Sequence, residues 1–195
     1  MRHSMLLARA VAALLVLGAA SGCTRPNYPS AWTALDRPSE DCSRLQGRYL
    51  DAGERDDGAA APSLSLLLTD REREDPAVDV VEIAVEPGPS LHVTAYREGR
   101  PVAEGHYSAA AETLDCAADG AVLEDYSGMS RGRGNPIAGY EGERKALHRA
   151  VDGSLVVERA WTTVGMIYFM FPIGGSERSW WRYPAADASL RGPAQ

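Results

Sequence analysis

Short segments in which apolar and polar residues alternate, joined by glycine-containing turns, fill most of the chain from residue 45 onward. Residues 80–85 and 91–96 are two such segments, and residues 87–90 form a proline- and glycine-rich turn between them. A period of two is typical of a half-buried β-strand. Asp119-Gly120 and Asp152-Gly153 each separate two further segments, and Asp-Gly favours the tight turn of a β-hairpin. The pattern predicts a series of antiparallel hairpins.

The remaining segments extend this prediction to a single all-β domain over residues 42–195. Residues 47–50, 64–68 and 102–107 are expected to be strands, and the glycine-rich stretch 127–142 is expected to be a loop. No segment has a sustained helical period. Because open strand edges promote aggregation, an antiparallel meander of this size is expected either to close into a barrel or to stack as a sandwich.

The most apolar part of the domain is near its C-terminus. Residues 161–173 form a run too short to cross a bilayer as a helix, which takes about 20 residues. A central strand covered on both faces produces such a run, and this is the expected structure. The alternative is an exposed aromatic patch that contacts lipid, a partner or an apolar ligand, formed by Trp161, Tyr168, Phe169, Phe171, Trp180 and Trp181.

Residues 1–22 have the pattern of a secretory signal. Arg2 and Arg9 form a basic start, the uncharged stretch Ala10–Ala20 follows, and small residues close the segment. This order of charge, apolar stretch and small residues is typical of an export signal. The apolar stretch is about half the length of a membrane-spanning helix. A cleaved signal is therefore predicted in preference to a permanent transmembrane helix.

The residues around the predicted cleavage site, Ala20-Ser21-Gly22-Cys23, resemble the lipobox of bacterial lipoproteins. In that family the cysteine thiol receives a diacylglyceryl group, the signal is cut just before it, and the new amine is usually acylated. The resemblance implies attachment to the outer membrane, facing the periplasm, because Thr24 stands where an aspartate would favour the inner membrane. Ala20-x-Gly22 also fits ordinary signal peptidase, so a secreted or soluble periplasmic protein is the alternative.

The chain has three cysteines, Cys23, Cys42 and Cys116. An exported protein enters an oxidising compartment, where an unpaired thiol is a liability. If Cys23 carries lipid, Cys42 and Cys116 remain and can form a disulfide. The alternative is a pair of buried free thiols.

Residues 23–41 are predicted to be a lipidated N-terminus followed by a tether. Pro26, Pro29 and Pro38 disfavour regular structure there, and no apolar period is present. Trp32 and Leu35 are the large apolar residues of this stretch, and they are expected to dock on the domain or on lipid.

The charge of the chain excludes one class of partner. Against 20 basic residues there are 27 acidic ones, which gives a net charge of −7, and two of the arginines leave with the signal. An acidic protein repels phosphate backbones, so nucleic-acid binding is not expected. The acidic charge also gives no electrostatic attraction to anionic lipid, so the predicted anchor has to hold the protein at the membrane by itself.

Two patterns bear on chemistry. Gly128-Met129-Ser130-Arg131-Gly132 fits the nucleophile elbow of serine hydrolases, in which a helix follows the serine. Residues 133–136 (Arg-Gly-Asn-Pro) are poorly suited to start a helix, so a glycine-rich loop is the expected structure. His92, His106 and His148 lack the spacing of a metal motif, so no metal site and no cofactor are predicted. The protein is therefore predicted not to be an enzyme, with a hydrolase using Ser130 as the lesser alternative.

One further resemblance concerns the fold. Gly47-Arg48-Tyr49 on the first predicted strand is similar to the Gly-x-Trp of lipocalins, which implies a calycin-like barrel but no particular ligand. The leading functional hypothesis is a non-catalytic envelope lipoprotein that acts as a structural or interaction module. The second hypothesis is a carrier that holds a small apolar ligand inside such a barrel.

Overall fold

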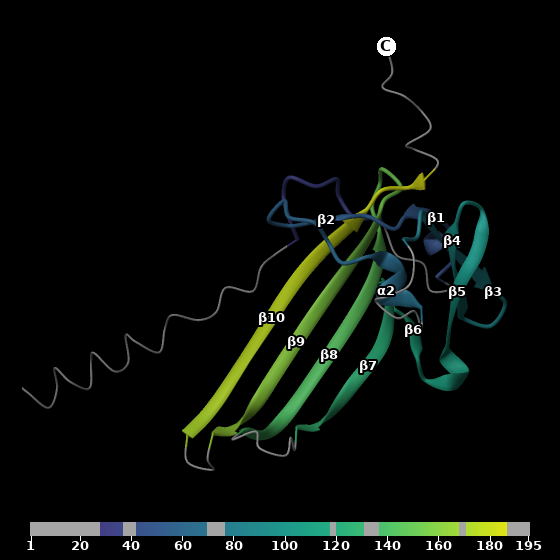
Figure 1. Ribbon diagram of the computed structural model, residues 1–195. Helices are drawn as coiled ribbons and strands as arrows, with labels where there is room; N and C mark the ends of the chain where they lie inside the picture. Colours follow the sequence, from purple (N-terminus) through teal and green to yellow (C-terminus); the bar gives the residue numbers. More distant parts are fainter. Residues whose placement is uncertain are drawn as a thin grey trace, which may run out of the picture.

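The computed structural model describes residues 28–36, 42–69, 77–117, 120–130, 137–167 and 171–186. Its strands form two antiparallel sheets (Figure 1). The four-stranded sheet has the order β1 (Gly47–Leu50), β3 (Val80–Glu86), β4 (Ser90–Arg97) and β5 (Arg100–Ser108). The six-stranded sheet has the order β2 (Glu54–Arg55), β10 (Phe171–Tyr183), β9 (Leu155–Ile167), β8 (Ile137–Arg149), β7 (Gly120–Ser130) and β6 (Leu114–Ala117). The described residues also form the short helices η1 (Ser43–Leu45), α2 (Leu64–Leu68) and η2 (Ala109–Ala111).

The all-β antiparallel fold is confirmed, and of the two predicted closures the sandwich fits. In the described part of the chain the two sheets remain separate, so the prediction of a closed, lipocalin-like barrel is wrong. Side chains from both sheets and from α2 fill the space between them, including Tyr49, Leu64, Leu68, Ile83, Leu91, Val93, Leu123, Leu147, Leu155, Val157 and Tyr183. Burial of each such side chain contributes about 1.5–3 kcal/mol.

The Gly47-x-Tyr49 tripeptide has a local explanation within this core. The buried hydroxyl of Tyr49 donates a hydrogen bond to the Leu45 carbonyl at 2.8 Å, and burial raises the pKa of Tyr49 to about 12. The ring lies over Gly47, where an added Cβ would come within 3.1 Å of the hydroxyl oxygen. The tripeptide therefore stabilises the first strand of a sandwich.

Residues 64–68 form the helix α2, so the prediction of a strand there is wrong. The helical turn buries Leu64 and Leu68 together on one side. Asp51, at the end of β1, accepts hydrogen bonds from the Leu64 amide through its carbonyl and from the Ser65 amide through its carboxylate. A partner from outside the segment thus satisfies the first helical amides, and such a partner is not visible in the local pattern.

Two further expectations fail in the six-stranded sheet. β7 runs to Ser130 and β8 begins at Ile137, so much of the predicted loop 127–142 is strand. Glycine is accommodated where strands approach closely: a Cβ on Gly139 would lie 2.5 Å from the Val164 carbonyl oxygen. The apolar run 161–173 is divided between β9 and β10 and is not one central strand.

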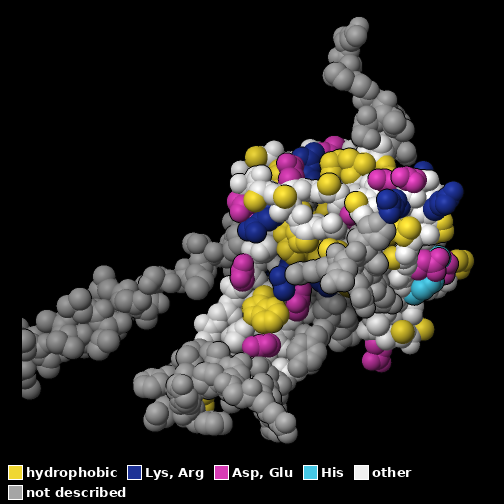
Figure 2. All heavy atoms as spheres, viewed as in Figure 1, with side chains coloured by type: hydrophobic (Ala, Val, Ile, Leu, Met, Phe, Trp, Pro, Cys, Tyr) yellow, Lys and Arg dark blue, Asp and Glu magenta, His cyan; other side chains and the backbone are white. Residues whose placement is uncertain are grey.

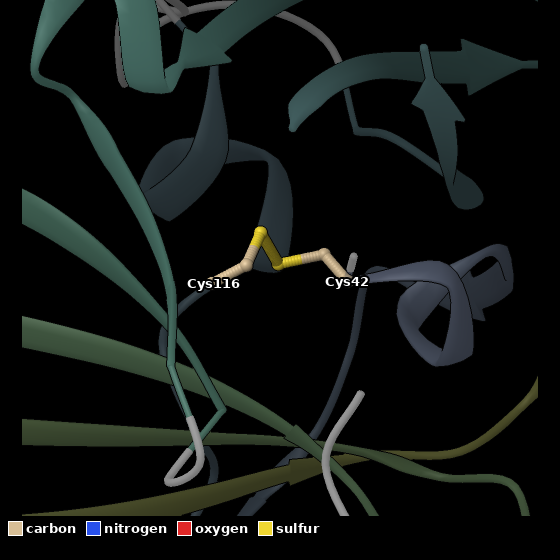
Figure 3. The surroundings of a disulfide bond; sticks show 2 residues. All are labelled: Cys42 and Cys116. Atoms are coloured by element: carbon tan, nitrogen blue, oxygen red, sulfur yellow. A yellow bond between two sulfur atoms is a disulfide. The ribbon is translucent and has the colours of Figure 1, made fainter. Parts of the chain in front are cut away.

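The predicted disulfide between Cys42 and Cys116 is present, with the two Cα atoms 5.5 Å apart. Figure 3 shows that it joins the start of η1 to β6. It therefore links the chain that leads into the four-stranded sheet to an edge strand of the six-stranded sheet. Cys42 itself is buried in the core.

Candidate functional site: a groove on the outer face of the large sheet

Strands β7 to β10 extend well beyond the four-stranded sheet (Figure 1). We call residues 124–130, 137–144, 160–167 and 171–178 the distal half of the large sheet, and the remainder of these strands the proximal half. On β9, Leu155 and Val157 of the proximal half are fully buried, whereas Val164 and Met166 of the distal half are 58% and 43% exposed. Among the described residues no strand pairs with the free sides of β7 and β10 in the distal half.

The large sheet has two faces, because successive side chains of a strand point in opposite directions. The inner face, which includes Leu147, Val157 and Trp181, packs against the four-stranded sheet and α2 in the proximal half. The outer face carries the alternate residues, among them Val156 and Trp180. Each face continues into the distal half, where the two faces have different characters.

The inner face of the distal half is polar. Arg159, at the boundary of the two halves, donates two hydrogen bonds to the Glu143 carboxylate, at 2.6 and 3.0 Å, and its guanidinium lies 5.8 Å from the centre of the Trp161 ring. The Trp161 indole donates a hydrogen bond to the Thr163 hydroxyl at 2.7 Å. Figure 2 shows hydrophobic side chains beside charged ones on the visible face of the six-stranded sheet. Glu143, Arg159, Trp161 and Thr163 are thus engaged with one another.

The outer face instead holds an open groove of about 740 Å³ that begins where the two halves meet. Its floor consists of small side chains, because Gly142 lies opposite Thr162 and Ala160 follows two residues away. The Tyr140 ring leans across Gly142, within 3.5 Å of where a Cβ would be, and Val122 lines the groove from β7. The other lining residues are Glu112, Leu114, Asp115, Leu123, Glu143 and Arg144.

The N-terminal segment packs on the same outer face, in the proximal half. The Tyr28 ring meets the Trp180 ring edge-on, with centroids 5.3 Å apart, and Trp32 and Leu35 pack on the same buried cluster. Leu35 forms an antiparallel bridge with Ala150. Of the predicted tether, residues 28–36 therefore lie against the domain, as expected for Trp32 and Leu35 if they dock on the protein.

Asp152, in the β8–β9 turn, fixes this segment to the sheet. Its carboxylate accepts hydrogen bonds from the Thr33 hydroxyl at 2.9 Å, from the amide and hydroxyl of Ser154, and from the Arg182 guanidinium. Partial burial raises the pKa of Asp152, but the hydrogen bonds from Ser154, Thr33 and Arg182 outweigh burial and hold that pKa at about 2.

Between the N-terminal segment and the groove lies a half-buried ion pair network. Glu158 lies 3.5 Å from His148 Nε2 and 2.9 Å from Arg178 Nε. The interaction with His148, followed by the charge of Arg178, lowers the pKa of Glu158 against the opposing effect of burial. The carboxylate therefore stays ionised, and these groups are engaged with one another.

The structure separates the three tryptophans of the predicted aromatic patch. Trp181 lies in the core on the inner face, and Trp180 is buried on the outer face beneath Tyr28. Trp161 is half-buried on the inner face of the distal half. Phe171 begins β10, while Tyr168 and Phe169 lie outside the described residues, as does Cys23. The described tryptophans thus do not form one surface, because alternation along β10 sends Trp180 and Trp181 to opposite faces.

Ser130 is the last residue of β7 and pairs with Gly139 of β8. Gly128, Met129 and Ser130 of the Gly-x-Ser-x-Gly match therefore belong to a pair of antiparallel strands, while Arg131 and Gly132 lie outside the described residues. The groove residues Tyr140 and Gly142 were missed from the sequence because residues 127–142 were expected to be a loop.

Comparison with known protein families, curated proteins and solved structures gives no match. Within the described residues, no helix has the length and apolar character that crossing a bilayer requires.

Proposed function

We propose that the protein is a membrane-anchored envelope lipoprotein, attached through Cys23, that acts as a non-catalytic binding module for the apolar chain of an amphiphile. The observation that carries this proposal is the open groove on the outer face of the large sheet. Its volume of about 740 Å³ lies within the roughly 300–1,000 Å³ that is usual for small-molecule sites.

The lining of the groove favours an apolar chain over a polar ligand. Gly142 and Ala160 form a low floor beside Thr162, and Tyr140 and Val122 provide apolar walls. Glu112, Asp115 and Arg144 add charged groups elsewhere in the lining, where the polar end of an amphiphile would be accommodated. Val164, directly opposite Tyr140 in the register, extends the exposed apolar surface toward the end of the sheet. Exposed apolar surface of this kind is typical of a binding site.

The N-terminal segment supports the choice of a membrane-derived ligand. Cys23 precedes Tyr28 by five residues, so the chain between them reaches at most about 17 Å when fully extended. Tyr28 packs on Trp180 on the outer face. Acyl chains on Cys23 would therefore keep the outer face, and the groove on it, near the bilayer surface.

The anchor is tested by mass spectrometry of the protein extracted from its own cell membranes. We expect the N-terminal peptide to begin at Cys23 and to carry the mass of a diacylglyceryl group, and we expect the Cys23→Ala variant to be recovered in the soluble envelope fraction. An unmodified Cys23, or a mature chain that begins elsewhere, would contradict lipid anchoring.

The groove is tested with the soluble Cys23→Ala protein and a dansyl-labelled fatty acid, whose fluorescence rises in an apolar site. Thr162→Glu places a carboxylate in the groove, and the neighbouring Thr163→Glu places the same group on the opposite face. We expect Thr162→Glu to weaken binding by about tenfold or more, because an apolar chain would have to desolvate the charge, and Thr163→Glu to have little effect. Equal affinities for the two variants would overturn the proposed ligand site. If the protein extracted from its membranes carried a bound protein in place of a lipid, that result would point instead to the free edge of β10.

A further inference from the structure

The exposed face of the four-stranded sheet brings together two histidines that are distant in the sequence. His92 of β4 lies directly opposite His106 of β5, and their imidazole rings stack with centroids 4.2 Å apart. His92 Nε2 is 3.8 Å from a Glu104 carboxylate oxygen, and His92 Nδ1 is 4.0 Å from Glu86. Figure 2 shows a histidine side chain directly beside acidic side chains at the right of the molecule.

The donor atoms of this cluster lie close enough together to share one ion. One ligand atom from each of His92, Glu104 and His106 lies within 4.8 Å of the others. Ligand atoms around a tetrahedral zinc ion, at bonds of about 2.1 Å, are about 3.4 Å apart. Glu104 is on the surface and His106 is exposed, so small side-chain rotations would close the remaining gap.

His92 provides a second observation. Its Nε2 atom is buried, yet it has no hydrogen-bond partner among the described residues. A buried polar atom left without a partner costs about 1–3 kcal/mol, and native structures usually avoid that cost. A metal ion bound between His92 and Glu104 would satisfy this nitrogen.

We propose that His92, His106 and Glu104 bind a divalent transition-metal ion on the outer surface of the four-stranded sheet, with Glu86 as an additional carboxylate beside it. Imidazole nitrogens favour zinc, copper and nickel, whereas magnesium and calcium prefer sites made of oxygen atoms alone. Three protein ligands leave at least one coordination position open, unlike the closed sites of structural zinc. The site is therefore suited to reversible binding of an ion from the surrounding solution.

The experiment uses the mature protein, extracted from membranes, freed of metal with a chelator and titrated with zinc chloride by isothermal calorimetry. We expect one zinc ion per chain. Glu104→Gln removes one ligand at an exposed position and is expected to weaken binding by more than about tenfold. Glu177→Gln, an exposed glutamate on β10, is the matched control and is expected to bind zinc as the unchanged protein does.

A spectroscopic readout identifies the ligands independently of affinity. In the imidazole region of a ¹H–¹⁵N NMR spectrum, zinc is expected to shift the resonances of His92 and His106 and to leave those of His148 in place. His106→Ala, at an exposed position, is expected to abolish the shift of His92. No saturable binding at millimolar zinc, or binding that survives both Glu104→Gln and His106→Ala, would overturn the site.

Discussion

The proximal and distal halves of the large sheet belong to the same strands but differ in what covers them. On the outer face of β9, the proximal Val156 has no exposed surface, whereas Val164 and Met166 lie open further along the strand. The ladder pairing of β8, β9 and β10 continues through both halves. The difference lies in the second layer: among the described residues, the small sheet, α2 and the N-terminal segment pack on the proximal half.

The two halves of the sheet therefore have different roles, one in stability and one in binding. Backbone pairing continues through the distal half, but burial of side chains, the main favourable term in folding, is concentrated in the proximal half. We therefore expect substitutions in the proximal half to change stability, and substitutions in the distal half to change binding.

The largest effect is expected from the disulfide, which joins the chain before η1 to β6, beside the proximal half of β7. Replacing both Cys42 and Cys116 with alanine opens a loop of 74 residues and is expected to lower the free energy of unfolding by about 4 kcal/mol, because the unfolded chain gains entropy. Urea denaturation measures this loss. A reducing agent should destabilise the unchanged protein but not the double variant, and a loss below about 1 kcal/mol would show that the two layers hold together without the bond.

Two truncations on β9, one in each half, test this difference. Leu155→Ala removes buried atoms in the proximal half and is expected to cost about 3 kcal/mol through lost burial and a new cavity. Met166→Ala, in the distal half, is expected to stay within about 0.5 kcal/mol. Thermal and urea unfolding of both variants measure the difference. If Met166→Ala cost as much as Leu155→Ala, the distal half would belong to the core.

The features that depend on neighbouring residues could be predicted from the sequence. Alternation at residues 80–85 and 91–96 and the Asp152-Gly153 turn predicted β3, β4 and the β8–β9 hairpin. The disulfide was predicted because the chain has three cysteines, and lipid on Cys23 would leave Cys42 and Cys116 to pair. Each of these signals is local or compositional, and therefore readable from one sequence.

The features that were missed depend on residues far apart. α2 owes its first hydrogen bonds to Asp51, outside the helix. The histidine pair depends on an irregularity between Ala95 and Tyr96, where the register of β4 and β5 shifts by one residue. Without that shift, the hairpin would place Gly105 opposite His92 and turn His106 to the other face. The extent of the distal half was hidden as well, because its glycines resemble those of a loop.

The smallest of the three expected losses of stability concerns residues 28–36, which cover the outer face of the proximal half. Asp152 holds Thr33 and Arg182, so Asp152→Ala should release residues 28–36 from the sheet and expose Trp180, which makes the proximal outer face resemble the distal one. We expect a loss of about 1–2 kcal/mol at neutral pH, after allowance for solvent screening at this partly exposed position. Tryptophan fluorescence of the folded protein should shift to longer wavelength as Trp32 and Trp180 meet water.

The dependence of this loss on pH follows from the lowered pKa. Because the folded pKa of Asp152 is about 2 and the ordinary value is 3.8, the unfolded chain takes up the proton first as the pH falls. The stabilisation is therefore complete above the ordinary value and is lost as the pH falls through about 2. We expect the stability difference between the unchanged protein and Asp152→Ala to shrink toward zero between pH 5 and pH 2, roughly the window of that titration. Asp57→Ala, at an exposed turn, is the control and should show no comparable loss of stability. If the stability difference between the unchanged protein and Asp152→Ala persisted undiminished at pH 2, the N-terminal segment would be held by Tyr28, Trp32 and Leu35 without the carboxylate.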